Sequence, residues 1–99
     1  MSLESKKIAT AQAVGQSVGV TMDKTPFMQR HAGVAVLTSS TDRVVQLQES
    51  NDDQATWQNV VGVAVSSGTN RFALPSLSAA YRIDVSGGTA GTGDCEIEA

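Results

Sequence analysis

The sequence predicts an all-β domain, an antiparallel β-sandwich of about eight short strands in an Ig-like or jelly-roll-like arrangement. Short runs of alternating apolar and polar residues recur along the chain, and turn-forming residues separate them. The clearest example is residues 44–50, an alternating run that enters a polar turn, after which the only tryptophan, Trp57, follows. This pattern is typical of a β-hairpin whose aromatic residue closes one end of a β core.

A chain of 99 residues forms a single small domain. Residues 1–7 are polar and are expected to form a flexible N-terminal arm, so that residues 8–99 make up the sandwich domain. The first residues do not resemble a secretory signal, and no apolar run is long enough to span a bilayer. We therefore expect a soluble protein that is made in the cytoplasm.

The predicted strands follow in chain order, and each is defined by the residues that share one face. Ile8, Thr10 and Val14 share the parity of a strand, although the alanines between them also suit a helix. The later strands have these inward-facing residues: Val18, Val20 and Met22; Val45 and Leu47; Trp57, Val61, Val63 and Val65; Phe72 and Leu74; Tyr81, Ile83 and Val85; Cys95 and Ile97.

Three other segments complete the predicted fold. Residues 34–37 are apolar on both faces, which indicates a central strand of a sheet. Pro75 ends the strand before it or marks that strand as an edge, because proline cannot donate a hydrogen bond to a neighbouring strand. The glycine-rich segment 86–93 is expected to be a flexible connection, since no Gly-Lys-Ser/Thr sequence follows it that would indicate a phosphate-binding loop.

Composition and charge argue against several classes of function. Aromatic residues make up 4% of the chain, so the core must be built mainly from valine, leucine, isoleucine and alanine. A core of such small side chains is thin, and we expect oligomerisation or docking to a partner to add stability. The net charge of −3 argues against binding to nucleic acid or to an anionic membrane, because both need a basic surface.

No group of residues predicts a catalytic centre, a cofactor or a metal site, and we do not expect an enzyme. His31 is the only histidine, and no Gly-x-Ser-x-Gly sequence accompanies it. One histidine and the single cysteine, Cys95, fall short of the ligands that zinc takes, and Cys95 is expected to be a buried small hydrophobe. Asn51, Asp52 and Asp53 gather oxygen atoms, but such residues usually bond their own turn.

Two segments carry the residues that we predict to contact a partner. Large apolar residues follow Pro26 in a polar connection, where they either cap an open end of the sandwich or anchor a partner. The N-terminal arm carries one leucine and two lysines that would become ordered against a neighbouring protein. The predicted contact residues are Leu3, Lys6, Lys7, Phe27, Met28 and Arg30.

One segment resembles a motif of small phage virion structural proteins. In that motif an alternating strand ends in Gln-x-Ser-x-Asp-Gly, and Thr-Trp and another strand follow shortly afterwards. The matching residues in this chain are Gln48, Ser50, Asp52, Thr56 and Trp57. Residues 80–89 also resemble the strand and glycine turn that close such domains.

The resemblance has one departure and one competing interpretation. Asp53 stands where the motif has glycine, and aspartate tolerates a left-handed backbone better than most residues, so the hairpin is expected to survive with a different turn type. Discoidin-like and other carbohydrate-binding sandwiches contain a similar Ser-x-Asp-Gly-x-x-Trp hairpin. A sugar site needs an exposed aromatic residue, whereas the parity of Trp57 with Val61 and Val63 predicts a place in the core or at its edge.

The resemblance to phage proteins implies a capsid decoration (cement) protein located on the virion surface. Its partner would be the major capsid protein of a phage, and it would bind as a homo-oligomer, for which we expect a trimer. Such proteins have no enzymatic activity and no cofactor. The alternatives are a carbohydrate-binding β-sandwich module and an accessory component of a phage tail or head–tail junction.

Overall fold

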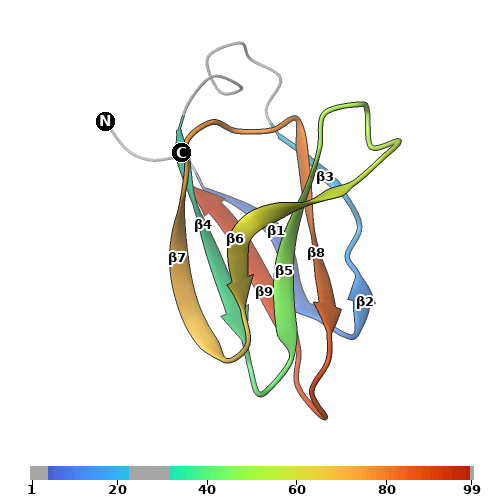
Figure 1. Cartoon of the computed structure of the whole chain (residues 1–99), viewed down its shortest axis with the longest axis vertical. Coiled ribbons are helices and arrows are strands. Elements are labelled where there is room, and N and C mark those ends of the chain that lie inside the picture. Colours follow the sequence, from blue (N-terminus) through green and yellow to red (C-terminus); the bar gives the residue numbers. More distant parts are fainter. Residues whose placement is uncertain (1–4, 23–31, 99) are drawn as a thin grey trace.

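The computed structural model describes residues 5–22 and 32–98. Within these residues, nine strands form two antiparallel sheets that pack face to face as a β-sandwich (Figure 1). The described part of the chain contains no helix that is long and apolar enough to span a membrane. The strands are β1 (Ser5–Gln12), β2 (Gly15–Gln16), β3 (Val20–Thr21), β4 (Gly33–Ser39), β5 (Val44–Ser50), β6 (Gln58–Val65), β7 (Gly68–Leu74), β8 (Ala80–Ser86) and β9 (Gly93–Glu98).

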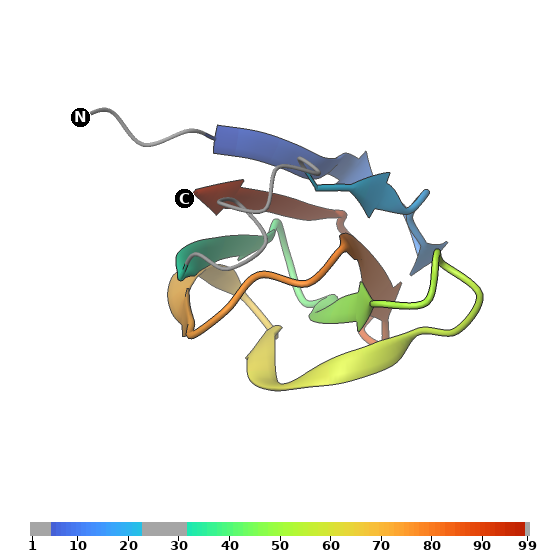
Figure 2. The ribbon, with the colours of Figure 1, turned by 90° about the horizontal axis from the view of Figure 1, so that it is seen from above.

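The strand order is that of a jelly roll. Sheet A has the order β1-β9-β4-β7, and sheet B has the order β2-β8-β5-β6, with β3 also paired to β8. Figure 2 looks along the sandwich and separates these two layers. Because β2 and β3 pair with the same strand, they act as one interrupted strand, which leaves four strands in each sheet. The predicted sandwich of about eight strands is therefore confirmed, and its connections follow the jelly-roll pattern.

The core lies between the sheets and consists of the residues that point inward from the central strands. Their alternation is the predicted one in β5, β8 and β9. Burying each large aliphatic side chain stabilises the fold by about 1.5–3 kcal/mol. The central strands contribute these buried residues: Ala35 and Leu37 from β4, Val45 and Leu47 from β5, Tyr81, Ile83 and Val85 from β8, and Cys95 and Ile97 from β9.

Two further predictions about sheet A agree with the structure. The strand β4, apolar on both faces, pairs with β9 on one side and β7 on the other, so it is a central strand. β7 ends at Leu74, immediately before Pro75, and forms an edge of its sheet.

The N-terminal segment begins its regular structure earlier than expected. β1 starts at Ser5 and pairs with β9, so Ser5–Lys7 belong to the sheet and not to a flexible arm. The alanine-rich stretch after Lys7 is a strand, not a helix, and Ile8 is buried as its parity predicts. Alanine has a high helix propensity, but tertiary contacts override propensity, and here the backbone hydrogen bonds to β9 decide the structure.

The prediction that Val18 faces inward is wrong, because its side chain is 85% exposed. The strand is interrupted between β2 and β3, and Ser17 occupies the inward position instead. The backbone N–H of Ser17 donates to the carbonyl of Ile83, and the Ser17 hydroxyl accepts from the N–H of Ile83, both at 2.9 Å. Two hydrogen bonds to one residue of β8 thus turn the chain and push Val18 into solvent.

The predicted parity of β6 is wrong at Val61, because an irregular bulge interrupts the strand. Gln46 pairs with Ala64 and Gln48 with Asn59, so residues 60–63 lie opposite Leu47 alone. Gly62 adopts a φ of 78°, a left-handed conformation that suits glycine. As a result Val61 is 95% exposed, while the later residues Val63 and Val65 are buried as expected.

The side chain of Gln46 closes this bulge. Its amide nitrogen lies 2.8 Å from the carbonyl oxygen of Leu47, 3.0 Å from that of Val60 and 3.1 Å from that of Val63. The bulge removes the regular backbone partners of this segment, and the amide supplies donors in their place. Gln46 therefore holds the edge strand β6 against β5.

We expect Gln46→Ala to lower the free energy of unfolding by about 1–3 kcal/mol, because carbonyl oxygens in the bulge lose their donor. Urea denaturation followed by circular dichroism measures this change. The matched control is Gln16→Ala, since Gln16 is exposed and makes no side-chain hydrogen bond within the described residues. The control should change the stability by less than about 0.5 kcal/mol. Equal effects of the two substitutions would contradict this role for Gln46.

Candidate functional site

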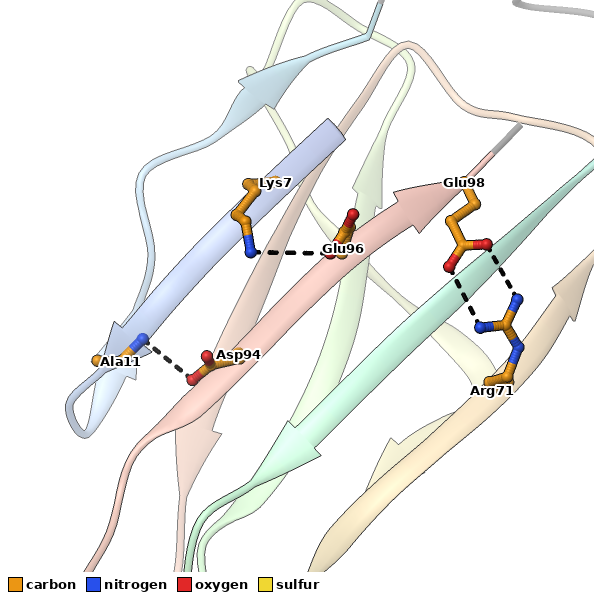
Figure 3. Close-up of polar contacts among 6 residues, drawn as sticks. All are labelled: Lys7, Ala11, Arg71, Asp94, Glu96 and Glu98. Atoms are coloured by element: carbon orange, nitrogen blue, oxygen red, sulfur yellow. Dashed lines mark hydrogen bonds and ion pairs between the residues drawn. The ribbon is translucent and has the colours of Figure 1, made fainter. Parts of the chain in front are cut away.

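The outer face of sheet A carries a row of carboxylates on β9 (Figure 3). Glu98 accepts hydrogen bonds at 3.2 and 3.0 Å from the two terminal nitrogens of Arg71, and this pairing raises the pKa of the Arg71 guanidinium. Glu96 lies 3.8 Å from the ammonium group of Lys7. Asp94 accepts a hydrogen bond at 3.0 Å from the backbone N–H of Ala11 in β1. Such exposed pairs add little stability but make this face mixed in charge.

Only two of the predicted contact residues, Lys6 and Lys7, lie in the described part of the chain. The ammonium group of Lys6 donates to the carbonyl oxygen of Thr21 at 2.6 Å, which ties β1 of sheet A to β3 of sheet B. The side chain of Lys7 is 73% exposed beside Glu96. The predicted contact residues Leu3, Phe27, Met28 and Arg30, together with His31, lie outside the described residues.

The motif between β5 and β6 forms a self-bonded loop, as predicted for its acidic residues. Asp52 accepts hydrogen bonds from the hydroxyl and backbone N–H of Thr56 and from the hydroxyl of Ser50. These hydrogen bonds, those from Thr56 first, lower the pKa of the Asp52 carboxyl to about 2. The Ser50 hydroxyl in turn accepts from the N–H of Gln54 at 3.0 Å.

The backbone of the loop explains the glycine in the motif. Asp53 has a φ of 62°, so the position where the motif has glycine is left-handed in this chain. The next residue, Gln54, is also left-handed, with a φ of 65°, and its side-chain amide donates to the hydroxyl of Thr21 at 3.0 Å. The loop thus reaches across the end of β8 to β3, as Figure 1 shows.

Trp57 lies outside the core, in contrast to the predicted parity. Its ring is half-buried, and the guanidinium carbon of Arg82 stands 4.5 Å from the ring centroid. Arg82 points outward from sheet B and donates to the side-chain oxygen of Gln48 at 2.7 Å. Gly19 lies at the ring edge, where an added Cβ would come within 2.7 Å of a ring carbon. The ring therefore packs on the outer face of sheet B.

A shallow groove of about 450 Å³ opens beside Trp57. It lies where the loop after β5 meets the start of β6, and its wall is mostly polar. Its lining residues are Glu49, Ser50, Asn51, Asp52, Thr56, Trp57 and Gln58. Within the described residues no cluster of three or more His, Cys, Asp or Glu side chains could hold a metal ion.

The glycine-rich connection between β8 and β9 is held by side chains, which corrects the expectation of a flexible loop. Asp42 accepts hydrogen bonds from the N–H of Ala90 and from the N–H and hydroxyl of Thr89, and these lower the pKa of its carboxyl. Arg43 donates to the carbonyl oxygens of Gly87 at 2.8 Å and Gly91 at 3.2 Å. The connection joins the two sheets and does not form a hairpin within one.

Cys95 is buried, as predicted, with 2% of its surface exposed. Burial, together with the negative charge of Glu96, raises the pKa of the thiol to about 12. The thiol therefore stays protonated near neutral pH and is a poor nucleophile.

No family model, curated protein or solved structure matches this chain.

Three side chains that shape these surfaces, Gln46, Arg43 and Arg82, were not predicted from the sequence. The outward parity of Arg82 in its strand could be read from the sequence, but its contact with Trp57 comes from a distant strand. Asp42 and Arg43 follow a turn-rich stretch, and charged residues at the end of a turn are a weak signal on their own.

We expect the stability of the protein to fall as the pH drops from about 4 towards 2, partly through Asp52. The folded pKa of Asp52, about 2, lies below its usual value of 3.8, so its stabilisation is present above pH 4 and is lost on protonation. Asp52→Asn should flatten this decline, measured by urea unfolding at pH 7, 4 and 2.5. The adjacent Asp53→Asn makes the same chemical change one residue away and is the matched control. If the stability of Asp52→Asn declines with falling pH as steeply as that of the wild type, the decline is not caused by Asp52.

We expect Asp42→Ala to loosen the connection between β8 and β9 without unfolding the core. The amides of Thr89 and Ala90 lose their acceptor, so their hydrogen exchange should become at least about tenfold faster. Amide exchange monitored by NMR measures this, with the core amide of Leu47 as an internal reference. Asp84→Ala removes the same charge from the outer face of β8 and serves as the control. Unchanged exchange at Thr89 in the Asp42 variant would show that the carboxylate does not hold the connection.

Proposed function

We propose that this protein is a virion structural protein of the decoration (cement) type, which binds the surface of an assembled phage capsid and stabilises the shell. The observation that carries the proposal is the resemblance of the segment 48–57 to phage virion proteins. Three of the matching residues, Ser50, Asp52 and Thr56, form one hydrogen-bonded loop, and the motif's glycine position is left-handed. The shared residues are thus those that determine the shape of the hairpin.

The jelly-roll arrangement agrees with this proposal. Viral capsid proteins and lectins are among the proteins that use this architecture. A shared fold does not by itself define a function, so this agreement is an analogy and the motif remains the stronger argument.

The proposed mechanism is stabilisation by linkage. A protein that binds the assembled shell, and not its free subunits, shifts the equilibrium between subunits and shell towards the shell. The shift grows with the ratio of the free concentration of the protein to its dissociation constant. Many copies on one lattice add up, so a modest affinity per copy suffices. The proposed partner is the major capsid protein, the proposed location is the virion surface, and the bound form is a homo-oligomer, for which we propose a trimer.

The proposed contact surface includes the predicted residues of the N-terminal segment and of the connection that contains Phe27 and Met28. Lys7 is the described residue that best suits such a contact, because its exposed ammonium group projects from sheet A beside a single carboxylate. A cation at the margin of an acidic face can pair with an acidic group of a partner with little loss of folding stability.

Co-sedimentation with purified capsids of the phage that encodes the protein tests the proposal. We expect saturable binding to mature shells and a higher melting temperature of the decorated shell. Lys7→Glu should weaken binding to the capsid by about tenfold, since it places a negative charge opposite the acidic group of the partner. The matched control is Arg71→Glu, because Arg71 also pairs with a carboxylate of β9 but lies outside the predicted contact set.

A protein that stays in the supernatant with every form of the shell would refute the decoration proposal. Co-sedimentation with isolated tails or head–tail connectors alone would also refute it and would favour the accessory role.

A further inference from the structure

We propose that the groove beside Trp57 binds a neutral saccharide. The groove combines a half-exposed aromatic ring with planar polar side chains, and its volume of about 450 Å³ suits a small ligand. This site lies on the loop between β5 and β6 of sheet B, whereas Lys7 projects from sheet A, and its test does not depend on the proposed binding to capsids.

Two side chains of the groove, Glu49 and Asn51, each use one polar atom in a hydrogen bond within the protein. The second polar atom of each side chain is then available to a ligand. One carboxylate oxygen of Glu49 accepts from the hydroxyl of Ser78, and the side-chain oxygen of Asn51 accepts from the N–H of Ala79 at 2.8 Å. The second oxygen of Glu49 and the amide nitrogen of Asn51 have no partner among the described residues. The groove thus presents an acceptor and two donor hydrogens whose positions are set by the fold.

This pair suits adjacent hydroxyl groups. A hydroxyl both donates and accepts, so neighbouring sugar hydroxyls can donate to the carboxylate of Glu49 and accept from the amide of Asn51. The exposed amide of Gln58 adds a further donor and acceptor at the rim of the groove. Because Glu49 and Asn51 are held in advance, little side-chain entropy is lost when a ligand binds.

Trp57 supplies the apolar surface that a sugar ring needs. The carbon–hydrogen face of a pyranose packs on an aromatic ring, and the remaining hydroxyls stay within reach of polar groups. Arg82 holds the indole from one side at 4.5 Å, and Gly19 permits close packing at the ring edge. The ring is therefore fixed as a platform, with its exposed part bordering the groove.

Charge selects a neutral ligand over an anionic one. Glu49 and Asp52 both place carboxylates in the groove wall. The guanidinium group of Arg82 lies at the indole ring and is not among the residues that line the groove. Anionic polysaccharides and nucleic acids would meet two like charges on a chain whose net charge is already −3.

Titration of the full protein with soluble oligosaccharides tests this inference, with the fluorescence of Trp57 as a direct reporter. The probes are maltohexaose, cellohexaose, mannohexaose and chitohexaose, with dextran sulfate as the anionic comparison. We expect a saturable change of emission with at least one of the neutral probes and none with dextran sulfate.

Two conservative variants test the assigned contacts. Asn51→Asp keeps the acceptor for Ala79 but removes the free donor, and Glu49→Gln keeps an acceptor for Ser78 but removes the negative charge. Each should weaken binding by about tenfold or more. The matched controls are Asn70→Asp and Glu96→Gln, which make the same chemical changes on sheet A, and both should bind like the wild type.

Several results would overturn the saccharide site. They are the absence of any response to the four neutral probes at millimolar concentrations, a response to dextran sulfate alone, and equal losses in the groove and control variants. Because the readout uses the isolated protein, a failure here leaves the capsid proposal standing, and a failure to bind capsids leaves the groove intact.

Discussion

The fold depends on the packing of aliphatic side chains between the central strands of the two sheets. β4 and β9 contribute one layer of this core, and β5 and β8 contribute the other. Leu37, Val45, Leu47, Ile83 and Val85 are fully buried, so aliphatic side chains fill the centre of the sandwich as the structure describes it. The groove beside Trp57 and the charged row on β9 lie on the outer faces of the two sheets.

Polar side chains support the places where the backbone departs from regular pairing. Gln46 donates hydrogen bonds to carbonyl oxygens in the bulge of β6, and Asp52 accepts hydrogen bonds within the loop that precedes β6. Asp42 and Arg43 form hydrogen bonds with the backbone of the connection between β8 and β9, which passes from one sheet to the other. In each case the local chain lacks regular backbone partners, and a side chain supplies them: Asp52 from within the loop itself, the others from a neighbouring segment. Asp52 and its two partners, Ser50 and Thr56, also line the groove beside Trp57.

The sequence predicted the fold class and the strands with strict alternation, such as Val45 with Leu47 and Cys95 with Ile97. Alternation of apolar and polar residues identifies the inward-facing side chains when a strand is regular and one of its faces is buried. The prediction failed where the period changes, at the bulge before Val63 and at the interruption near Val18, because one bulge reverses the assignment of faces along a strand.

The surroundings of the candidate site could be predicted only in part. The self-bonding of Asp52 within its own turn is local and was expected from the residue types. The position of Trp57 depends on Arg82 and Gly19, which are distant in the sequence, and no local pattern reveals such contacts. The predicted contact residues Lys6 and Lys7 were expected in an arm but belong to β1, since their pairing partner is the last strand of the chain.

The most direct test of this account is a methyl NOE spectrum of the free protein, which reports distances across the core. The packing described above predicts NOEs between Leu37 or Ile97 of sheet A and Leu47 or Ile83 of sheet B. It also predicts that the indole protons of Trp57 show none to Ile97. Strong NOEs from the indole to Ile97, or none between the two aliphatic layers, would contradict the proposed core and with it the position of the groove.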